Sequence, residues 1–344
     1  SSWDANIIMS NQFDFNKLTI AFNSKKSNLS HPFSPTPKYY NKNYNLPKSF
    51  MNNSISYNYF NPVFYARGEI AISNVKGWAT THFISTELTE NLALNLNYRI
   101  FSEDYRSFYT NTYKRNSSVQ NETGFYTEMN YNTYSISIIS RFNYYENKNP
   151  RYLLHLPSIG RSYDQLIRMR LSDSLFVELK YQYKISPKEQ GEQKLDYFEN
   201  KYEHKLYARV NLKLSEKWIF TSRIGYNNVI IKASNKGFVF AQDLTYKKGR
   251  KQLTLRISVV NSETWDNRFY MYENDMLHNF SVPVYYDKST RLYLNYTYKL
   301  NKRWQLWMKY EMNQFVNKTS IGSGSNKIKG NIKSVIKWQV RFNF

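Results

Sequence analysis

Apolar and polar side chains alternate along this chain with a period of two. The clearest segment lies between Ile332 and Phe344, where the even-numbered residues are almost all apolar and the odd-numbered ones almost all polar. Successive side chains of a strand point to opposite faces, whereas a helix returns to the same face after about 3.6 residues. The alternation therefore predicts an amphipathic β-strand.

The same alternation recurs upstream, at residues 92–99, 175–184, 206–214, 291–300 and 304–313. These segments are about 9–13 residues long, whereas strands of soluble proteins usually run about 5–6 residues. A soluble β-sandwich also alternates, so the pattern alone does not indicate a membrane. The length of the strands does favour one that crosses a bilayer.

The connections between these segments differ in length. Short turns are expected at residues 89–91, 131–133, 172–174, 215–217, 248–250 and 301–303, with further turns near Asn11 and Asn61. Longer polar loops are expected at residues 103–121, 146–162, 186–201, 227–236, 262–289 and 317–330. Short periplasmic turns opposite long outer loops are typical of outer-membrane barrels.

Together these patterns predict an all-β fold, a closed antiparallel transmembrane β-barrel of about 16–18 strands formed by residues 1–344. Short turns recur about every 40 residues, which is also the length of a propeller blade, but no blade motif repeats. A turn near Asn11 would start the chain on the outer side. Since such barrels have an even number of strands, we expect this barrel to lack an N-terminal piece.

Composition narrows the class further. The mean hydropathy is −0.69 and no run of 18 apolar residues exists, which excludes a helical membrane protein. A polar chain with net charge +22 could be disordered, but 18% aromatic residues argue against that. There is no cysteine, so disulfides, thiolate metal sites and cysteine nucleophiles are excluded.

Aromatic residues near the ends of apolar faces suggest contact with lipid and lipopolysaccharide. We expect an interfacial girdle that includes Tyr183, Trp218, Trp304 and Trp338. The chain closes on Phe344 after an amphipathic strand, and this end is similar to the signal read by the β-barrel assembly machinery. A chance apolar residue at the last position is the alternative.

Many basic residues fall on the polar sides of these strands, where a barrel would have its lumen. They are Arg99, Arg141, Lys180, Arg209, Lys213, Arg223, Arg256, Lys309, Lys337 and Arg341. Rings of Arg and Lys tune a pore towards anions. Alternatively they pair with Glu178, Asp243 and Glu311 and simply fill the interior. Because 48 basic residues face only 26 acidic ones, pairing cannot neutralise all of them.

Other chemistries have weaker support. Basic residues interleaved with aromatics at 105–115 could bind nucleic acid, but aromatics occur throughout the chain, so we do not expect nucleic acid as a partner. The five histidines stand far apart, which indicates no metal site. Residues 322–324 lack the strand–turn–helix context of a nucleophile elbow. No cofactor and no enzymatic activity are expected.

Several short stretches are similar to a known family: residues 76–80, 121–126, 270–275, 280–283, 321–324 and 328–331, together with the closing strand. They resemble the C-terminal barrel of Bacteroidota outer-membrane proteins with helix-hairpin-helix domains, from about residue 70 to the end. In that family a helix-hairpin-helix region similar to DNA-binding competence proteins precedes the barrel. Here the first residues already alternate like strands, so DNA uptake has no support in this sequence.

The leading hypothesis is a Gram-negative outer-membrane protein that acts as a pore or translocation conduit with a cationic lumen. A second hypothesis, of a different class, is an occluded structural or assembly barrel whose outer loops bind partner proteins of an outer-membrane complex. An outer-membrane enzyme is a third, for which the resemblance supplies no catalytic residues.

Overall fold

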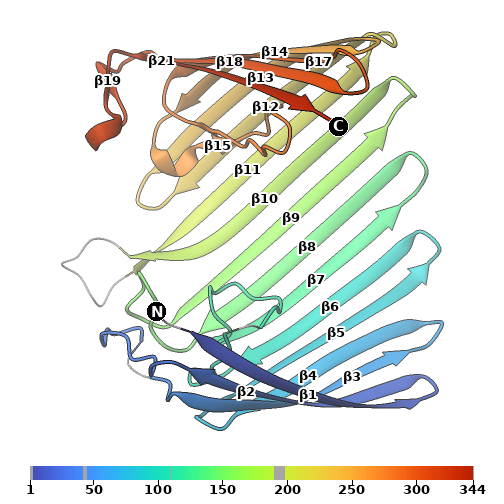
Figure 1. The fold of residues 1–344 in the computed structure, drawn as a ribbon, viewed down its shortest axis with the longest axis vertical. Coiled ribbons are helices and arrows are strands. Elements are labelled where there is room, and N and C mark those ends of the chain that lie inside the picture. Colours follow the sequence, from blue (N-terminus) through green and yellow to red (C-terminus); the bar gives the residue numbers. More distant parts are fainter. Residues whose placement is uncertain (1–2, 42–44, 109, 190–197, 344) are drawn as a thin grey trace. The chain divides into compact units, whose positions relative to one another are not determined.

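A computed structural model describes residues 3–41, 45–108, 110–189 and 198–343. Seventeen long strands account for most of these residues (Figure 1). They are β1 Asp4–Phe15, β2 Leu18–Leu29, β3 Ser49–Phe60, β4 Phe64–Ser73, β5 Trp78–Thr89, β6 Leu92–Phe101, β7 Glu122–Asn132, β8 Ile136–Asn147, β9 Ser158–Arg170, β10 Leu175–Glu189, β11 Phe198–Lys213, β12 Trp218–Ile230, β13 Ser234–Lys248, β14 Lys251–Ser262, β17 Ser289–Lys299, β18 Trp304–Phe315 and β21 Ile332–Phe342.

Four two-residue strands and two short 3-10 helices lie in the connections. The strands are β15 Phe269–Tyr270, β16 Val284–Tyr285, β19 Ser320–Ile321 and β20 Ile328–Lys329, and the helices are η1 Trp265–Asn267 and η2 Gly324–Asn326. Neither helix is long or apolar enough to span a membrane.

The seventeen long strands belong to one sheet, within the expected 16–18. Strands that follow one another along the chain pair antiparallel, as β1 to β7 do, and so do the strands from β12 to β21. Alternating sequences of 10–16 residues thus form long antiparallel strands. The expected all-β fold with long antiparallel strands in one sheet is therefore confirmed.

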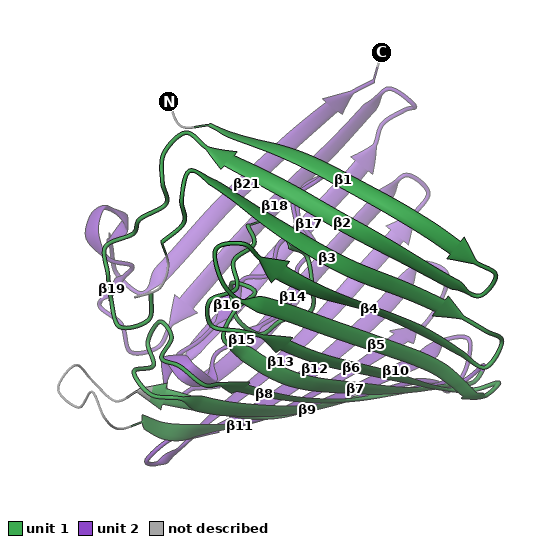
Figure 2. Cartoon of the chain, turned by 90° about the horizontal axis from the view of Figure 1, so that it is seen from below, with its two compact units in different colours: residues 1–133, 138–165, 183–202 green, residues 134–137, 166–182, 203–344 purple. Residues whose placement is uncertain are grey.

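The chain divides into two compact units, which we treat separately (Figure 2). Among the described residues, unit 1 comprises those within 1–133, 138–165 and 183–202, and unit 2 comprises those within 134–137, 166–182 and 203–344. Unit 1 therefore contains the whole of β1 to β7, and unit 2 contains the whole of β12 to β21.

Each unit has one apolar face and one polar face. In unit 2, Phe238 and Phe240 are exposed on β13, while their neighbours Val239 and Ala241 are fully buried on the other side. The apolar face of unit 2 also exposes Ile224, Ile257, Val259, Trp304, Met308, Ile336, Trp338 and Val340. In unit 1 a cross-strand row of Phe22, Ile55 and Ile70 is exposed in the same way. A continuous exposed apolar surface of this kind suits contact with lipid.

Most of the expected turns are present. The six short turns lie between consecutive strands at or next to the predicted residues, and residues 61–63 join β3 to β4. The turn expected near Asn11 is wrong, because β1 continues to Phe15 and the chain reverses at Asn16, which adopts a left-handed φ of 46°. Phe13 and Phe15 extend the alternation past Asn11, which is a polar residue within the strand.

Two expected long loops are shorter in the structure. The loop expected at residues 227–236 shrinks to residues 231–233, since Asn227 and Val229 belong to β12 and are buried on the polar face. The loop expected at 146–162 shrinks to residues 148–157, because β9 begins at Ser158. Residues 190–197 of the loop expected at 186–201 lie outside the described part of the chain.

Candidate functional site

The longest connection of unit 2, residues 263–288 between β14 and β17, folds onto the polar face of that unit. We call it the β14–β17 loop. Its Phe269, Met271 and Tyr285 join Val239, Ala241 and Val260 in one buried apolar cluster. The long polar loop that the sequence predicts here is present, but its core residues are buried against the sheet instead of extending into solvent.

Glycines on β12 and β13 let the loop approach the sheet closely. A Cβ atom at Gly237 would lie 2.7 Å from the backbone oxygen of Asn267, and one at Gly225 would lie 3.1 Å from the ring of Phe269. Asn227 on the same face donates its side-chain amide to the Asn267 carbonyl at 3.3 Å. The loop therefore rests on the sheet through its backbone at Gly237 and through the Phe269 side chain at Gly225, where a Cβ atom would crowd it.

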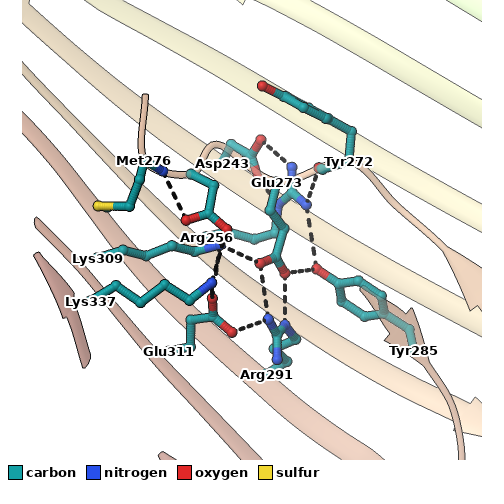
Figure 3. A network of polar contacts seen from close by, with 11 residues as sticks. Asp243, Arg256, Tyr272, Glu273, Met276, Tyr285, Arg291, Lys309, Glu311 and Lys337 are labelled. Carbon is teal, nitrogen blue, oxygen red and sulfur yellow. Dashed lines mark hydrogen bonds and ion pairs between the residues drawn. The ribbon is translucent and has the colours of Figure 1, made fainter. Parts of the chain in front are cut away.

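Glu273 is the most heavily contacted carboxylate of the loop, and its side chain is fully buried (Figure 3). Arg291 on β17 donates to it through Nε at 2.7 Å and Nη2 at 2.9 Å, a bidentate pair. Lys309 on β18 donates at 3.1 Å and the Tyr285 hydroxyl donates as well. A buried carboxylate with this many donors holds the loop to two strands at once.

Asp275 makes the second contact between the loop and the sheet. Its Oδ2 lies 3.3 Å from Nζ of Lys309 and 3.0 Å from Nζ of Lys337 on β21. Glu311 completes this part of the cluster, with Oε1 2.9 Å from Lys309 and Oε2 2.7 Å from Nη2 of Arg291. Two lysines and an arginine are thus shared among three carboxylates (Figure 3).

Asp243 on β13 forms the third part. It accepts hydrogen bonds from Nε and Nη2 of Arg256 at 2.5 and 2.8 Å, and it also pairs with Arg223. Arg256 then donates through Nη1 to the Tyr272 carbonyl of the loop at 2.8 Å. The β13 carboxylate therefore orients an arginine that binds the loop backbone.

We call these side chains the charge network of unit 2. Its members are the cations Arg223, Arg256, Arg291, Lys309 and Lys337 and the carboxylates Asp243, Glu273, Asp275 and Glu311. Five positive charges face four negative ones, so the network is close to neutral. A buried charge without a partner is strongly destabilising. Such pairing is therefore needed where the β14–β17 loop covers the polar face.

The two loop carboxylates have shifted pKa values. Burial would raise the pKa of Glu273, but the hydrogen bonds and positive charge of Arg291 outweigh it, and the pKa lies below its ordinary 4.5. For Asp275 burial is likewise outweighed, here by the Met276 amide and by Lys337 and Lys309, and the pKa lies below 3.8. Both groups are therefore ionised at neutral pH.

Unit 1 has a comparable loop, residues 102–121 between β6 and β7, described apart from Tyr109. We call it the β6–β7 loop. Arg99 on β6 is fully buried and donates Nε to Glu122 on β7 at 2.6 Å. Glu122 also accepts the backbone N–H groups of Arg115 and Asn116 at 2.9 Å. One ion pair thus anchors the loop through its backbone.

The β6–β7 loop also covers apolar residues of the sheet. Tyr105 and Val119 join Ala71, Ala79 and Phe101 in a buried cluster. Burial raises the pKa of Tyr105 to about 12, so its hydroxyl stays protonated. The loop is therefore held by an apolar contact as well as by the ion pair.

The expected lumen cations lie in three kinds of environment. Arg99, Arg256 and Lys309 are fully buried and paired, and Arg223 is nearly so. Partly exposed ones pair with nearby carboxylates: Arg141 with Glu128 at 2.5 Å, Arg209 with Glu178 at 4.0 Å, Lys213 with Glu216 at 2.7 Å, and Lys337 as above. Lys180 is exposed, and so is Arg341, which donates to Asn343 at 2.7 Å.

The pairing that the sequence left open is therefore extensive. Glu178, Asp243 and Glu311 all bind cations of the expected set. Sequence reasoning missed Glu273, Asp275, Glu122 and Arg291. The available signal was the acidic content of the loop, since residues 263–288 contain five of the chain's 26 acidic residues, two of them at Glu273 and Asp275.

Of the expected girdle residues, Trp218 and Trp304 begin β12 and β18 next to short turns. Their rings pack on Tyr246 and Phe342, each at 4.6 Å between centroids. Trp338 is opposite Met308, further along the strands, and Tyr183 lies within β10. Phe344, the expected assembly signal, lies outside the described residues.

Comparisons with known proteins support the fold of this chain only. No protein-family model matches the sequence, and no curated protein matches it. The FpvAI–pyocin S2 complex is similar with a TM-score of 0.52 and 12% identity, over 100% of this chain and 49% of that one. This likeness shows the fold alone.

Two further structures have lower scores. The copper transporter OprC has a TM-score of 0.45 and 7% identity over 91% of this chain and 60% of its own. The anion-selective porin from Comamonas acidovorans has a TM-score of 0.44 and 9% identity over 100% of this chain and 100% of its own. The chain thus spans about half to three fifths of the FpvAI and OprC chains.

Proposed function

We propose that this chain is a β-barrel of the cell outer membrane that acts as a pore or translocation conduit, with its polar face lining the passage. The observation that carries the proposal is the sheet itself. In unit 2 the strands β12, β13, β14, β18 and β21 expose apolar residues on one face and carry charged or polar residues on the other. Lipid requires the first face and a water-filled passage requires the second.

We further propose that the sheet closes on itself. An open sheet edge within a bilayer would leave a row of backbone N–H and C=O groups without partners, at several kcal/mol each. Closure should make the folded protein resistant to SDS at room temperature, so that it migrates faster in a gel before heating than after. Identical mobility under both conditions would contradict a closed barrel.

The proposed passage is cationic but only moderately so. The charge network of unit 2 carries five positive and four negative side chains, so buried cations contribute little net charge. The exposed and half-exposed cations, such as Lys180, Arg209 and Arg341, would set the preference for anions. This narrows the set of residues to be tested.

Single-channel conductance in a planar bilayer with a salt gradient tests the proposal. Stable steps with a reversal potential favouring anions are expected, and the combined Lys180→Gln and Arg209→Gln variant should lower that preference. Lys302→Gln, in a short turn between β17 and β18, is the matched control and should change nothing. Unaltered selectivity in the double variant would contradict the role of these cations.

The fixed position of the β14–β17 loop supports a second candidate, an occluded structural barrel whose outer loops bind partner proteins. Two ion-paired carboxylates, Glu273 and Asp275, and the hydrogen-bonded carbonyl of Tyr272 hold this loop against the polar face. Replacing residues 264–287 by a short flexible linker discriminates the two candidates. Silence before the replacement and conductance after it would favour the occluded barrel, as would the loss of a co-purifying protein.

Other proposed partners follow from the apolar face. We propose that it contacts outer-membrane lipid and lipopolysaccharide, and that the β-barrel assembly machinery inserts the protein. The proposed relation to the barrels of Bacteroidota helix-hairpin-helix proteins rests on short stretches of sequence. Depletion of the assembly machinery should leave the protein outside the membrane fraction, and normal insertion would contradict this part.

A further inference from the structure

Exposed cations gather at three short turns of unit 2, which join β11 to β12, β13 to β14 and β17 to β18. With two residues on each side, these turns contain nine cations and one carboxylate, Glu216. Three short turns of unit 1, from β1 to β2, β3 to β4 and β5 to β6, contain one cation, Lys17, and two carboxylates, Asp14 and Glu90. We call the nine cations the basic rim, and all of them are exposed: Lys213, Lys217, Lys247, Lys248, Arg250, Lys251, Lys299, Lys302 and Arg303.

Backbone hydrogen bonds join these turns into one continuous edge. The N–H of Lys247 donates to the Lys217 carbonyl at 2.8 Å, and the N–H of Lys299 donates to the Arg250 carbonyl at 2.9 Å. Arg250 also donates Nη1 to the Leu300 carbonyl at 2.9 Å. The nine cations therefore belong to one surface.

Carboxylates neutralise little of the charge of the basic rim. Glu216 lies 2.7 Å from Nζ of Lys213 and is itself 89% exposed. Within the described part of the chain, the other eight cations form no ion pair. Lys248 and Lys251 are opposite each other in the register of β13 and β14. Like charges directly opposite one another are destabilising, so this pair would gain from a bound anion.

The basic rim lies where the apolar face of unit 2 ends. Lys248 continues the alternation of Tyr246 on β13 and is paired with Lys251, so both lysines lie on the apolar side of the sheet. Trp218 is opposite Tyr246, and Nζ of Lys251 lies 5.1 Å from the ring centre of Tyr298. Aromatic residues at the end of an apolar face mark the level of lipid headgroups. The two lysines are therefore expected at the depth of lipid phosphates.

Apolar side chains are exposed within the same turns. Leu214 is 59% exposed and Leu300 is 50% exposed. A bilayer interface accommodates cations and apolar side chains next to one another, because the apolar groups enter the acyl boundary while the cations contact headgroups. This combination favours a lipid surface over an acidic protein as the partner of the basic rim.

We propose that the basic rim binds the phosphate groups of anionic phospholipids in the periplasmic leaflet, which the short turns of outer-membrane barrels face. The proposal rests on the outer-membrane barrel proposed above, but not on whether its passage conducts. Lys248 and Lys251 contact the phosphates beside the aromatic residues, and each lysine near an anionic surface raises the affinity about fivefold. The short turns of unit 1 lack this charge and give no such preference.

Tryptophan quenching by brominated lipids tests the proposal, because Trp218 and Trp304 begin β12 and β18 beside the basic rim. The full chain is reconstituted in phosphatidylcholine bilayers that contain increasing amounts of brominated phosphatidylglycerol or, in parallel, brominated phosphatidylcholine. Stronger quenching by phosphatidylglycerol is expected, and added salt should weaken it. The double variant Lys248→Gln with Lys251→Gln should lower this relative affinity at least about fivefold.

The double variant Lys327→Gln with Lys329→Gln is the matched control. Both lysines are exposed and lie between β18 and β21, beyond the end of β18 that is opposite to Trp304. The control removes the same charge and should keep the preference of the wild type. The gel-mobility shift on heating confirms that each variant is folded.

The outcomes separate this proposal from the conduit. Equal quenching by the two lipids in wild type, or an equal loss in both double variants, would overturn the lipid site. Binding of polyglutamate through Lys248 and Lys251 without any lipid preference would indicate an acidic protein partner and would also overturn it. A lipid preference in a protein that does not conduct would support the site and contradict the conduit, and conductance without the preference would do the reverse.

Discussion

The two long loops that fold onto polar faces differ in how they are held. The β14–β17 loop of unit 2 contributes its own carboxylates, Glu273 and Asp275, to a network of nine charged side chains. The β6–β7 loop of unit 1 offers backbone N–H groups to a single ion pair, Arg99–Glu122, and lies beside a cavity lined mostly by amide and hydroxyl side chains. The first arrangement fills the polar face with paired charges, and the second leaves a cavity of about 700 Å³ beside the loop.

The strongest test of this difference removes one carboxylate from unit 2. Glu273→Ala leaves Arg291 and Lys309 buried without their central partner, which should cost about 3–5 kcal/mol in the docking of the loop. Limited proteolysis should then cut within residues 263–288, which wild type should resist. Glu216→Gln is the control, because Glu216 is 89% exposed, and should leave protection unchanged. Full protection in Glu273→Ala would refute the anchoring role.

In unit 1 a double-mutant cycle should give a smaller coupling. Arg99→Met and Glu122→Gln each break the buried pair, and we expect a coupling energy of about 2–3 kcal/mol from the denaturant dependence of unfolding. The backbone amides of Arg115 and Asn116 still need an acceptor, so Glu122→Gln alone retains part of the loop contact. Additive effects of the two substitutions would show that the pair does not anchor the β6–β7 loop.

A steric test concerns Gly237, where the β14–β17 loop approaches the sheet closely. Gly237→Ala places a Cβ atom 2.7 Å from the Asn267 carbonyl, and the loop backbone must move, at about 1–2 kcal/mol. Hydrogen exchange of the loop amides should rise while that of β2 to β5 stays constant. Unchanged exchange in the loop would mean that the close approach does not matter.

The smallest effect is expected from pH near neutrality. The pKa values of Glu273 and Asp275 are lowered in the folded state, so their stabilisation is fully present above the unfolded values of 4.5 and 3.8 and is lost as pH falls through the lower folded values. Protection of the loop from a chemical label, a readout that does not depend on protease activity, should therefore be constant from pH 7 to pH 4.5. It should weaken only below pH 4.5. In Glu273→Gln this acid-induced loss should be reduced. Loss of protection above pH 5 in wild type, about half a unit over the ordinary glutamate value, would contradict the direction of these shifts.

The strand architecture was accessible from sequence because its signal is local. A period of two is visible within ten residues, and the turn at 301–303 sits between two such segments. The same signal failed at Asn11, where a polar residue inside β1 resembled a turn, and at 227–236, where β12 and β13 extend because Asn227 finds carbonyl partners in the loop. Partners distant in sequence decide such cases.

The site was less accessible for the same reason. Arg256 and Lys309 were recognised as polar-face cations, but their carboxylates Glu273 and Asp275 lie in a loop that alternation says nothing about. Lys337 and Asp275 are 62 residues apart in the chain. Gly225 and Gly237, inside strands, were the overlooked sign that another segment approaches closely.

The contact between Lys337 and Asp275 also imposes an order in time. Lys337 belongs to β21, so the network is complete only after that strand has paired with β18. Before that pairing Asp275 has only one of its two lysine partners, Lys309, so the β14–β17 loop has its full set of ion pairs only with β21 in place. One lysine side chain therefore links the pairing of the C-terminal strand to the anchoring of a loop that precedes it by 62 residues.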